Sequence, residues 1–132
     1  INKYDYVVDG SDNFKTKFLL NDTCLKNKKN LISAAISKFD GHVFNFNFKD
    51  KKMPCIRCFY QEESISDNLL NCETEGVLGT IAGTVGSIQA NEVLKNILQI
   101  GKNLSGLILI IDLLNLNFRK VKIKKRYKCL CN

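Results

Sequence analysis

Six cysteines are the residues of this 132-residue chain best suited to chemistry, and they lie at positions 24, 55, 58, 72, 129 and 131. Cys55-x-x-Cys58 follows a predicted strand, and two thiolates at that spacing on a tight turn can reach one tetrahedral ion at about 2.3 Å. Cys129-x-Cys131 offers a second pair roughly seventy residues later. We predict that the four thiols hold a structural zinc ion. Four unligated thiols and a redox dithiol are the alternatives.

The two remaining cysteines differ in their surroundings. Cys24 falls on the apolar stripe of a predicted helix, which favours a core residue. Cys72 lies in a polar loop just before a long helical segment, where the helix dipole would stabilise a thiolate. Glu73 and Glu75 act against that effect, so the local chemistry predicts a surface cysteine, with a reactive thiol as the alternative.

Other candidate motifs are weaker. His42 is the only histidine, and a single histidine beside a strand favours a structural role. Gly79, Gly83 and Gly86 do not form a dinucleotide fingerprint, because no strand precedes them and they fall inside an apolar helical segment. Their spacing predicts close packing of that helix against a neighbour.

The elements that must position these residues follow from hydrophobic periodicity. A short buried strand is predicted over Tyr4–Asp9, a turn and helix cap over 10–13, and a helix from Phe14 to about Lys28. Later strands are predicted at Leu31–Ile36, Val43–Phe48, Leu107–Asp112 and Phe118–Lys124, and a long helix over Gly76–Ile100. The order indicates one mixed α/β domain, with a parallel unit first and antiparallel strands after it.

Charge and hydropathy exclude several classes of protein. The net charge is +7, but residues 119–132 carry seven basic side chains and no acid, so the rest of the chain balances 13 basic against 13 acidic residues. A surplus confined to one stretch argues against nucleic-acid binding. The apolar runs at 77–88 and 104–114 are shorter than the roughly 20 residues that a membrane span needs. With no leader at its start, the chain is expected to be soluble and cytoplasmic, or to lie in the stroma of an organelle.

Several segments together resemble one known family. Tyr4–Phe14, read as YDYVVDGSDNF, is similar to the strand and loop of ubiquitin-activating-enzyme-like adenylyltransferases of the ThiF/MoeB type, which activate sulfur carriers for molybdopterin or thiamine synthesis. Further segments match in the same order, with Asp112 and Phe118-Arg119 after them: Asn21–Cys24, Pro54–Phe59, Asn71–Gly79 and Gly86–Glu92. The resemblance covers nearly the whole chain and implies a Rossmann-like α/β fold.

The resemblance also implies an activity and a set of site residues. ATP would adenylate the C-terminal glycine of a ubiquitin-like sulfur-carrier protein ending in Gly-Gly, which a sulfur donor then attacks. Asp12 would engage Mg-ATP with Asn13 beside it, and Cys55, Cys58, Cys129 and Cys131 would hold structural zinc. Cys72 matches a cysteine that carries a thioester or acyl-disulfide intermediate in some members. The family further implies a homodimer.

The chain also departs from the family pattern. The Gly-rich nucleotide loop and its neighbouring phosphate-binding residues, which precede this segment in the family, are not in residues 1–132, so the chain resembles the C-terminal portion of an adenylyltransferase domain. It is not expected to bind ATP well alone. Lys17 stands where arginine is usual. The alternative function is a zinc-stabilised, non-catalytic binding or scaffold module that grips an acidic partner through residues 119–128.

Overall fold

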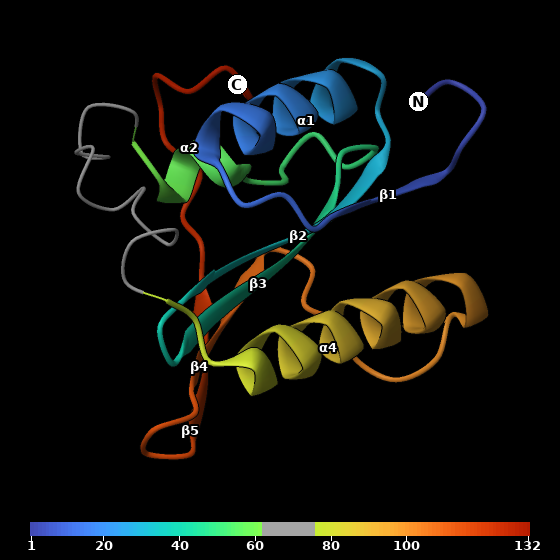
Figure 1. Cartoon of the computed structure of the whole chain (residues 1–132). Coiled ribbons are helices and arrows are strands. Elements are labelled where there is room, and N and C mark those ends of the chain that lie inside the picture. The colour runs from blue at the N-terminus through green and yellow to red at the C-terminus, as the bar shows by residue number, and fades with distance from the viewer. Residues whose placement is uncertain (62–75) are drawn as a thin grey trace.

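A five-stranded sheet lies between two helices in the computed structural model of the chain, which describes residues 1–61 and 76–132 (Figure 1). Helix α1 covers the upper face of the sheet in this view, and α4 covers the lower face. The strands lie side by side in chain order, β1-β2-β3-β4-β5. The mixed α/β architecture predicted from the sequence is confirmed.

The first three elements form a parallel β-α-β unit. Strand β1 (Tyr6–Asp9) leads into α1 (Phe14–Lys26), and the chain returns in β2 (Asn30–Ser37) beside and parallel to β1. Asn13 caps α1, because its side chain accepts a hydrogen bond from the backbone N–H of Thr16 at 2.8 Å. This turn therefore begins the helix where the sequence predicts.

The remaining strands are antiparallel, as predicted. Strand β3 (Asp40–Asn47) pairs with β2, β4 (Leu107–Asp112) with β3, and β5 (Asn117–Lys122) with β4. Between β3 and β4 the chain forms the one-turn helix α2 (Ile56–Phe59) and the long helix α4 (Gly79–Leu98). Helix α4 ends earlier than the sequence suggests, because Gln99 takes a left-handed conformation with φ 54°.

Each face of the sheet has its own apolar core. On the α1 face the cluster is built around Phe44, Phe46 and Ile108, and the sulfur of Cys24 is fully buried in it, which confirms Cys24 as a core residue. On the α4 face Val43 and Ile111 pack with side chains of α4. Alternation along β3 sends neighbouring residues to opposite cores, so this strand holds the two layers together.

The glycines of α4 do not make the close packing that the sequence predicts. Gly79, Gly83 and Gly86 lie on the exposed side of the helix, and a Cβ at any of them would meet nothing within 4 Å. The close approach is at Gly41 of β3, where an added Cβ would lie 2.5 Å from Cγ2 of Val85. The prediction was wrong because the larger apolar side chains of α4, rather than its glycines, face the sheet.

No helix in the described part of the chain combines the length and the apolar character needed to cross a membrane.

Candidate functional site

Four cysteines from two distant segments meet beside α1. Cys55 precedes α2 (Ile56–Phe59) and Cys58 lies within it, whereas Cys129 and Cys131 belong to the segment after β5. All four Sγ atoms lie within 4.8 Å of one another. Cys55 Sγ lies 3.5 Å from Cys129 Sγ, and Cys58 Sγ lies 3.4 Å from Cys131 Sγ.

These separations fit a single tetrahedral ion. Four sulfur atoms at about 2.3 Å from a central zinc would lie about 3.8 Å apart, and the observed separations bracket that value. The one-residue spacing of Cys129 and Cys131 therefore brings both sulfur atoms to the cluster. The four thiols form a group that could hold one metal ion, as the sequence predicts.

Burial keeps two of these thiols protonated when no ion is bound. Burial and the neighbouring cysteines raise the pKa of Cys55 far above its usual value, and burial with hydrogen bonds to Cys58 and Cys129 raises the pKa of Cys131 to about 12. For Cys129, burial would raise the pKa, but hydrogen bonds from the Cys131 backbone and the neighbouring thiols outweigh it and lower the value. A bound cation would therefore have to displace protons.

Side chains of helix α1 bind the segment that carries the first cysteine pair. The Asn21 side-chain oxygen accepts a hydrogen bond from the backbone N–H of Ile56 at 3.0 Å. The Asp22 carboxylate accepts two more from the Arg57 guanidinium, at 2.9 and 2.8 Å. That guanidinium also lies 4.4 Å from the centre of the Phe18 ring. The Asn21-Asp22 dipeptide thus fixes α2 against α1, which explains its place among the matching segments.

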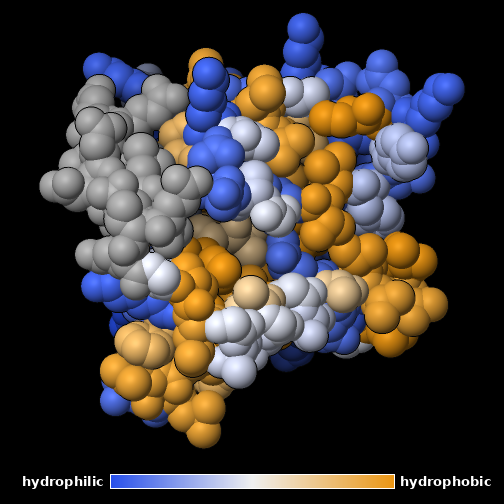
Figure 2. Space-filling model, in the orientation of Figure 1, coloured by the Kyte–Doolittle hydropathy of each residue, from blue (hydrophilic) through white to orange (hydrophobic). Residues whose placement is uncertain are grey.

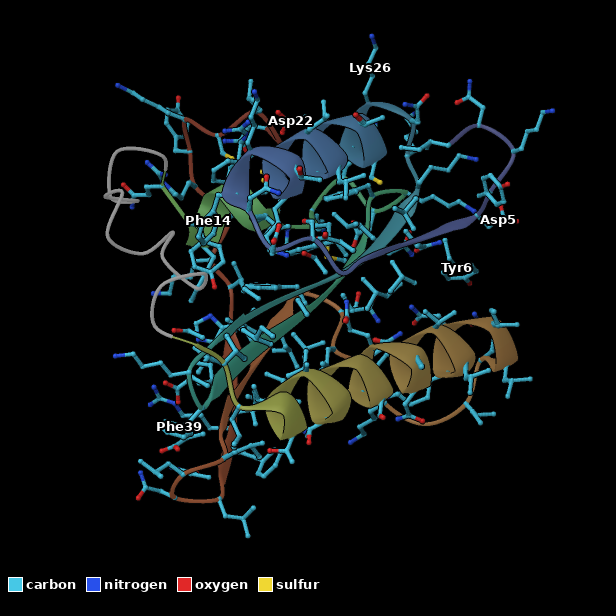
Figure 3. The ribbon with its side chains drawn as sticks, viewed as in Figure 1. Asp5, Tyr6, Phe14, Asp22, Lys26 and Phe39 are labelled. Atoms are coloured by element: carbon cyan, nitrogen blue, oxygen red, sulfur yellow. The ribbon has the colours of Figure 1, made fainter. Side chains whose placement is uncertain are left out.

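Partial burial would raise the pKa of Asp22, but the hydrogen bonds from Arg57 and Asn21 and the charge of Arg57 outweigh it and hold the pKa below its usual value. Asp22 therefore stays ionised and keeps its bidentate contact. Figure 3 shows Asp22 on α1 and Phe14 beside α2, where the Phe14 ring meets that of Tyr60 at 4.9 Å between centroids.

A second polar group lies at the carboxyl end of β1. The buried Asp9 carboxylate accepts hydrogen bonds from Lys17 Nζ at 3.0 Å, from Ser11 N and Oγ at 2.9 and 2.6 Å, and from Ser33 Oγ at 2.5 Å. Lys17, itself buried, also donates to the backbone carbonyl of Ala34. The sequence did not predict that Asp9 and Lys17 form a buried ion pair. The one signal in the sequence was the acid at the end of an apolar strand.

The predicted nucleotide residues lie just beyond this group. Asp12 and Asn13 are exposed on the loop from β1 to α1, and Asn13 Nδ2 donates to Asp12 Oδ1 at 3.1 Å. The structure places them together at the carboxyl end of a parallel strand and the N-terminus of a helix. Ligands of open α/β sheets bind at such an edge, and a helix N-terminus favours anions.

Helix α4 reaches the same end of the sheet from the opposite face. Gln89 Nε2 donates to the backbone carbonyl of Asp9 at 2.9 Å and to that of Ile32 at 3.3 Å. Its side chain thus links the carboxyl end of β1 to the N-terminal half of β2. Sequence analysis included Gln89 in a matching segment but assigned it no role.

Two further residues that the sequence analysis considered are Cys72 and His42. Cys72 lies outside the described residues. His42 of β3 is partly buried, its Nδ1 is hydrogen-bonded to the Tyr60 hydroxyl, and burial lowers its pKa. A neutral imidazole packed among aromatic rings agrees with a structural role.

The fold and the thiol cluster define a Rossmann-like α/β domain with a candidate metal centre, and comparisons with known proteins narrow that class. The model of the ThiF family matches residues 1–132. The chain belongs to the ThiF family.

Three relatives whose names state a function are adenylyltransferases. The chain is 38% identical over 130 residues to adenylyltransferase and sulfurtransferase MOCS3 of Xenopus laevis, covering 98% of this chain and 28% of that protein. It is 44% identical over 124 residues to a probable molybdopterin-synthase adenylyltransferase of Pyropia yezoensis, covering 93% and 32%. It is 39% identical over 129 residues to a sulfur carrier protein adenylyltransferase of Thermus thermophilus, covering 96% and 48%. The chain thus spans between a quarter and a half of these relatives.

Solved structures share the fold. The crystal structure of E. coli MccB with SeMet MccA superposes with a TM-score of 0.74 at 15% identity, over 96% of this chain and 38% of that one. At that identity the likeness concerns the fold alone.

Proposed function

We propose that this chain is the C-terminal portion of an ATP-dependent adenylyltransferase domain that activates the C-terminal glycine of a ubiquitin-like sulfur-carrier protein. The observation that carries the proposal is the match of 93 to 98% of the chain to proteins named as adenylyltransferases for molybdopterin synthase or a sulfur carrier, at 38 to 44% identity. The alternative of a non-catalytic binding module has no comparable support, because these relatives are named as enzymes.

The free edge of β1 supports the idea that an N-terminal half completes the domain. Within the described residues, β1 pairs on one side only, with β2, and it does so in parallel. Parallel sheets normally have both faces covered, yet the face of β1 that carries Val8 is open, with Val8 52% exposed. Strands carrying the glycine-rich nucleotide loop would add to this edge, and Asp12 would then face the bound nucleotide.

Asp12 has the chemistry that the proposed reaction needs. A carboxylate is a preferred ligand of Mg²⁺, and the Asp12 side chain is exposed at the end of β1, where it could hold the ion on the phosphates of ATP. The carrier's terminal carboxylate would attack the α-phosphorus, the bond to the β-phosphate oxygen would break, and pyrophosphate would leave. Asn13 would keep Asp12 in place through the hydrogen bond between their side chains.

The thiol cluster supports a structural rather than a catalytic metal. Four protein ligands leave no open coordination position, which is the pattern of structural zinc sites. We therefore assign zinc to Cys55, Cys58, Cys129 and Cys131, where it would tie the segment after β5 to α1 and α2. Cys72 is proposed to carry the covalent intermediate with the carrier during sulfur transfer from a donor protein.

The homodimer also stays a proposal. Apolar side chains are exposed along the C-terminal half of α4, with Leu94, Ile97 and Leu98 each more than half exposed. Figure 2 shows apolar surface gathered at that end of α4. Sedimentation equilibrium of the protein that contains this chain would test for the dimer.

Carrier-dependent exchange of pyrophosphate into ATP tests the proposed activity. The protein containing this chain should catalyse exchange with a carrier ending in Gly-Gly and not with a carrier that lacks those residues. Asp12→Asn should reduce the exchange at least about a hundredfold, in line with losing a group that stabilises transition-state charge. Asp50→Asn, at an exposed acid in the turn after β3, is the matched control and should retain it. An equal rate of exchange with and without the Gly-Gly residues of the carrier would refute the proposed substrate.

Elemental analysis tests the metal separately. We expect about one zinc per chain, lost in Cys55→Ser and in Cys131→Ser and retained in Cys24→Ala, because Cys24 is a buried core residue and not one of the four grouped thiols. Zinc retained in Cys131→Ser would contradict a site closed by four thiols. Absence of zinc with an intact fold would favour the redox alternative.

A further inference from the structure

Strands β4 and β5 extend beyond the helix that covers their side of the sheet. Helix α4 packs on β2 and β3. Leu107 and Leu109 of β4 are only partly buried on this face, and their partners on β5, Lys122 and Lys120, are exposed. The described part of the chain therefore leaves a sheet surface with leucines at its centre and lysines at its rim.

Two adjoining grooves occupy this surface, and they share Leu107. The first lies between α4, the loop after it and β4, encloses about 610 Å³, and has Leu104, Leu107 and Leu109 in its lining. Three lysines also line it: Lys95, Lys102 and Lys120. Of these, Lys95 is paired with Glu92, but no ion pair holds Lys102 or Lys120 in the described residues.

The second groove continues along β5 toward the C-terminal segment and encloses about 460 Å³. Four more lysines line it: Lys52, Lys122, Lys124 and Lys125. Asp50 is the one acid in its lining, and its carboxylate already accepts a hydrogen bond from the backbone N–H of Lys52 at 2.8 Å. Seven lysines thus surround the two grooves, and we call this surface the lysine groove.

The acids of the lysine groove do not balance these charges. Glu92 is 2% exposed and is held by Lys95, by Asn45 Nδ2 at 2.9 Å and by the backbone N–H of Leu104 at 2.7 Å. Among the residues that the structure describes, Glu92 and Asp50 offset two of the seven lysine charges and leave five without an acid to balance them, around an apolar floor. Such a surface complements a partner that presents acidic side chains around apolar ones.

We propose that the lysine groove is a docking surface for an acidic protein segment whose carboxylates alternate with apolar side chains. A second copy of the chain is a poorer occupant, because two such surfaces would bring lysine against lysine. Single-stranded nucleic acid is also poorer, because it is held by aromatic stacking and arginine, and neither groove is lined by an aromatic residue or an arginine. This surface is independent of the proposed adenylation.

Binding of labelled probes to the full chain tests the docking surface. Fluorescence anisotropy at 0.15 M salt would compare a 12-residue peptide of alternating Glu and Leu, one of alternating Glu and Ser, and a 20-nucleotide single-stranded DNA. We expect the Glu-Leu peptide to bind most tightly. Lys102→Glu/Lys120→Glu should weaken it at least about tenfold, since each exposed charge contact contributes a few-fold and reversal turns attraction into repulsion.

The matched control is Lys3→Glu/Lys26→Glu, which changes the net charge equally at exposed lysines away from the lysine groove. It should weaken the Glu-Leu peptide less than threefold, and circular dichroism would show that both variants are folded. An equal loss in the two variants would overturn the proposal, because attraction would then follow net charge. DNA or the Glu-Ser peptide binding as tightly as the Glu-Leu peptide would also overturn it.

Discussion

The buried ion pair between Lys17 and Asp9 gives the most direct test of how the carboxyl end of β1 is held. Lys17→Met keeps the length of the side chain and removes its charge and its donors. The Asp9 carboxylate would then remain buried with hydrogen bonds from Ser11 and Ser33 only. The carbonyl of Ala34 would lose its bond from Lys17 as well.

The expected cost follows from these contacts. Removing one partner of a buried ion pair costs about 3 to 5 kcal/mol, because the other charge stays buried without compensation. The remaining hydrogen bonds to Asp9 place the expected loss of unfolding free energy near the lower end, at about 3 kcal/mol. For a chain of this size that corresponds to a fall in Tm of about 10 °C. Lys17→Met/Asp9→Asn should recover part of the loss, because the amide carries no charge.

The cost should also depend on pH. Burial tends to raise the pKa of Asp9, but the hydrogen bonds from Ser11 and Ser33 and the charge of Lys17 outweigh it and lower the pKa. A lowered pKa stabilises the fold above the unfolded value near 3.8, and that contribution is lost as the pH falls through the lowered pKa. Without Lys17 the pKa of Asp9 rises, so protonation relieves the buried charge. The difference between wild type and variant should therefore be largest at pH 7 and smaller at pH 4.

Urea denaturation at both pH values measures these differences, with exposed Lys15→Met on the same helix as the matched control. The control should change the unfolding free energy by less than about 0.5 kcal/mol. A loss below 1 kcal/mol in Lys17→Met, or a loss that does not shrink toward pH 4, would refute the view that the pair holds this end of the sheet.

Four further substitutions test three other contacts. Asn21→Ala removes the acceptor of the backbone N–H of Ile56, the first residue of α2, so it should lower the unfolding free energy in urea by about 1 to 3 kcal/mol. It should also speed the loss of bound metal to a chelator. An unchanged rate of metal loss would contradict a role of α1 in holding the metal centre. Gln89→Leu should cost about 1 to 2 kcal/mol and increase amide hydrogen exchange at the carboxyl end of β1 and in the N-terminal half of β2. Unchanged exchange in these two segments would contradict the role of Gln89 in linking the strands. Gly41→Ala should cost about 1 to 3 kcal/mol through overpacking, whereas Gly83→Ala, in open space on a helix, should stabilise by about 0.5 to 1 kcal/mol. Equal thermal shifts for the two glycine variants would refute that contrast.

Much of the fold could be predicted because its signals are local. The period-two alternation over Val43–Phe48 and the cap at Asn13 each depend on a few neighbouring residues. Helix α1 begins where predicted, and β3 covers most of the predicted strand but runs from Asp40 to Asn47. The cysteine spacing was informative in the same way, since Cys55 and Cys58 share one turn. Placing Cys129 and Cys131 beside them needed the prior that distant cysteine pairs meet at zinc.

The contacts that sequence reasoning missed depend on tertiary packing. The resemblance marks Lys17 only as a departure from the usual arginine, and its ion pair with Asp9 depends on β2, which places Ser33 and the carbonyl of Ala34 beside it. Gln89 meets Asp9 across 80 residues, and no spacing rule predicts that contact. The glycines of α4 were misread because their spacing defines a helix face without saying which face meets the sheet.

The thiol cluster has a consequence for the order in which the chain folds. Every strand of the sheet pairs with the strand before it, but β3 and β4 pair across a long stretch of chain, from Phe44 with Ile108 to Asp40 with Asp112. The thiol pairs Cys55–Cys129 and Cys58–Cys131 join residues 74 and 73 positions apart, and earlier pairing of β3 with β4 would close most of that loop. In a chain-entropy description, closing a loop of that length removes about 4 kcal/mol of freedom from the unfolded chain. We therefore expect the thiols to gather last, so that a bound ion would slow unfolding and leave the rate of folding nearly unchanged.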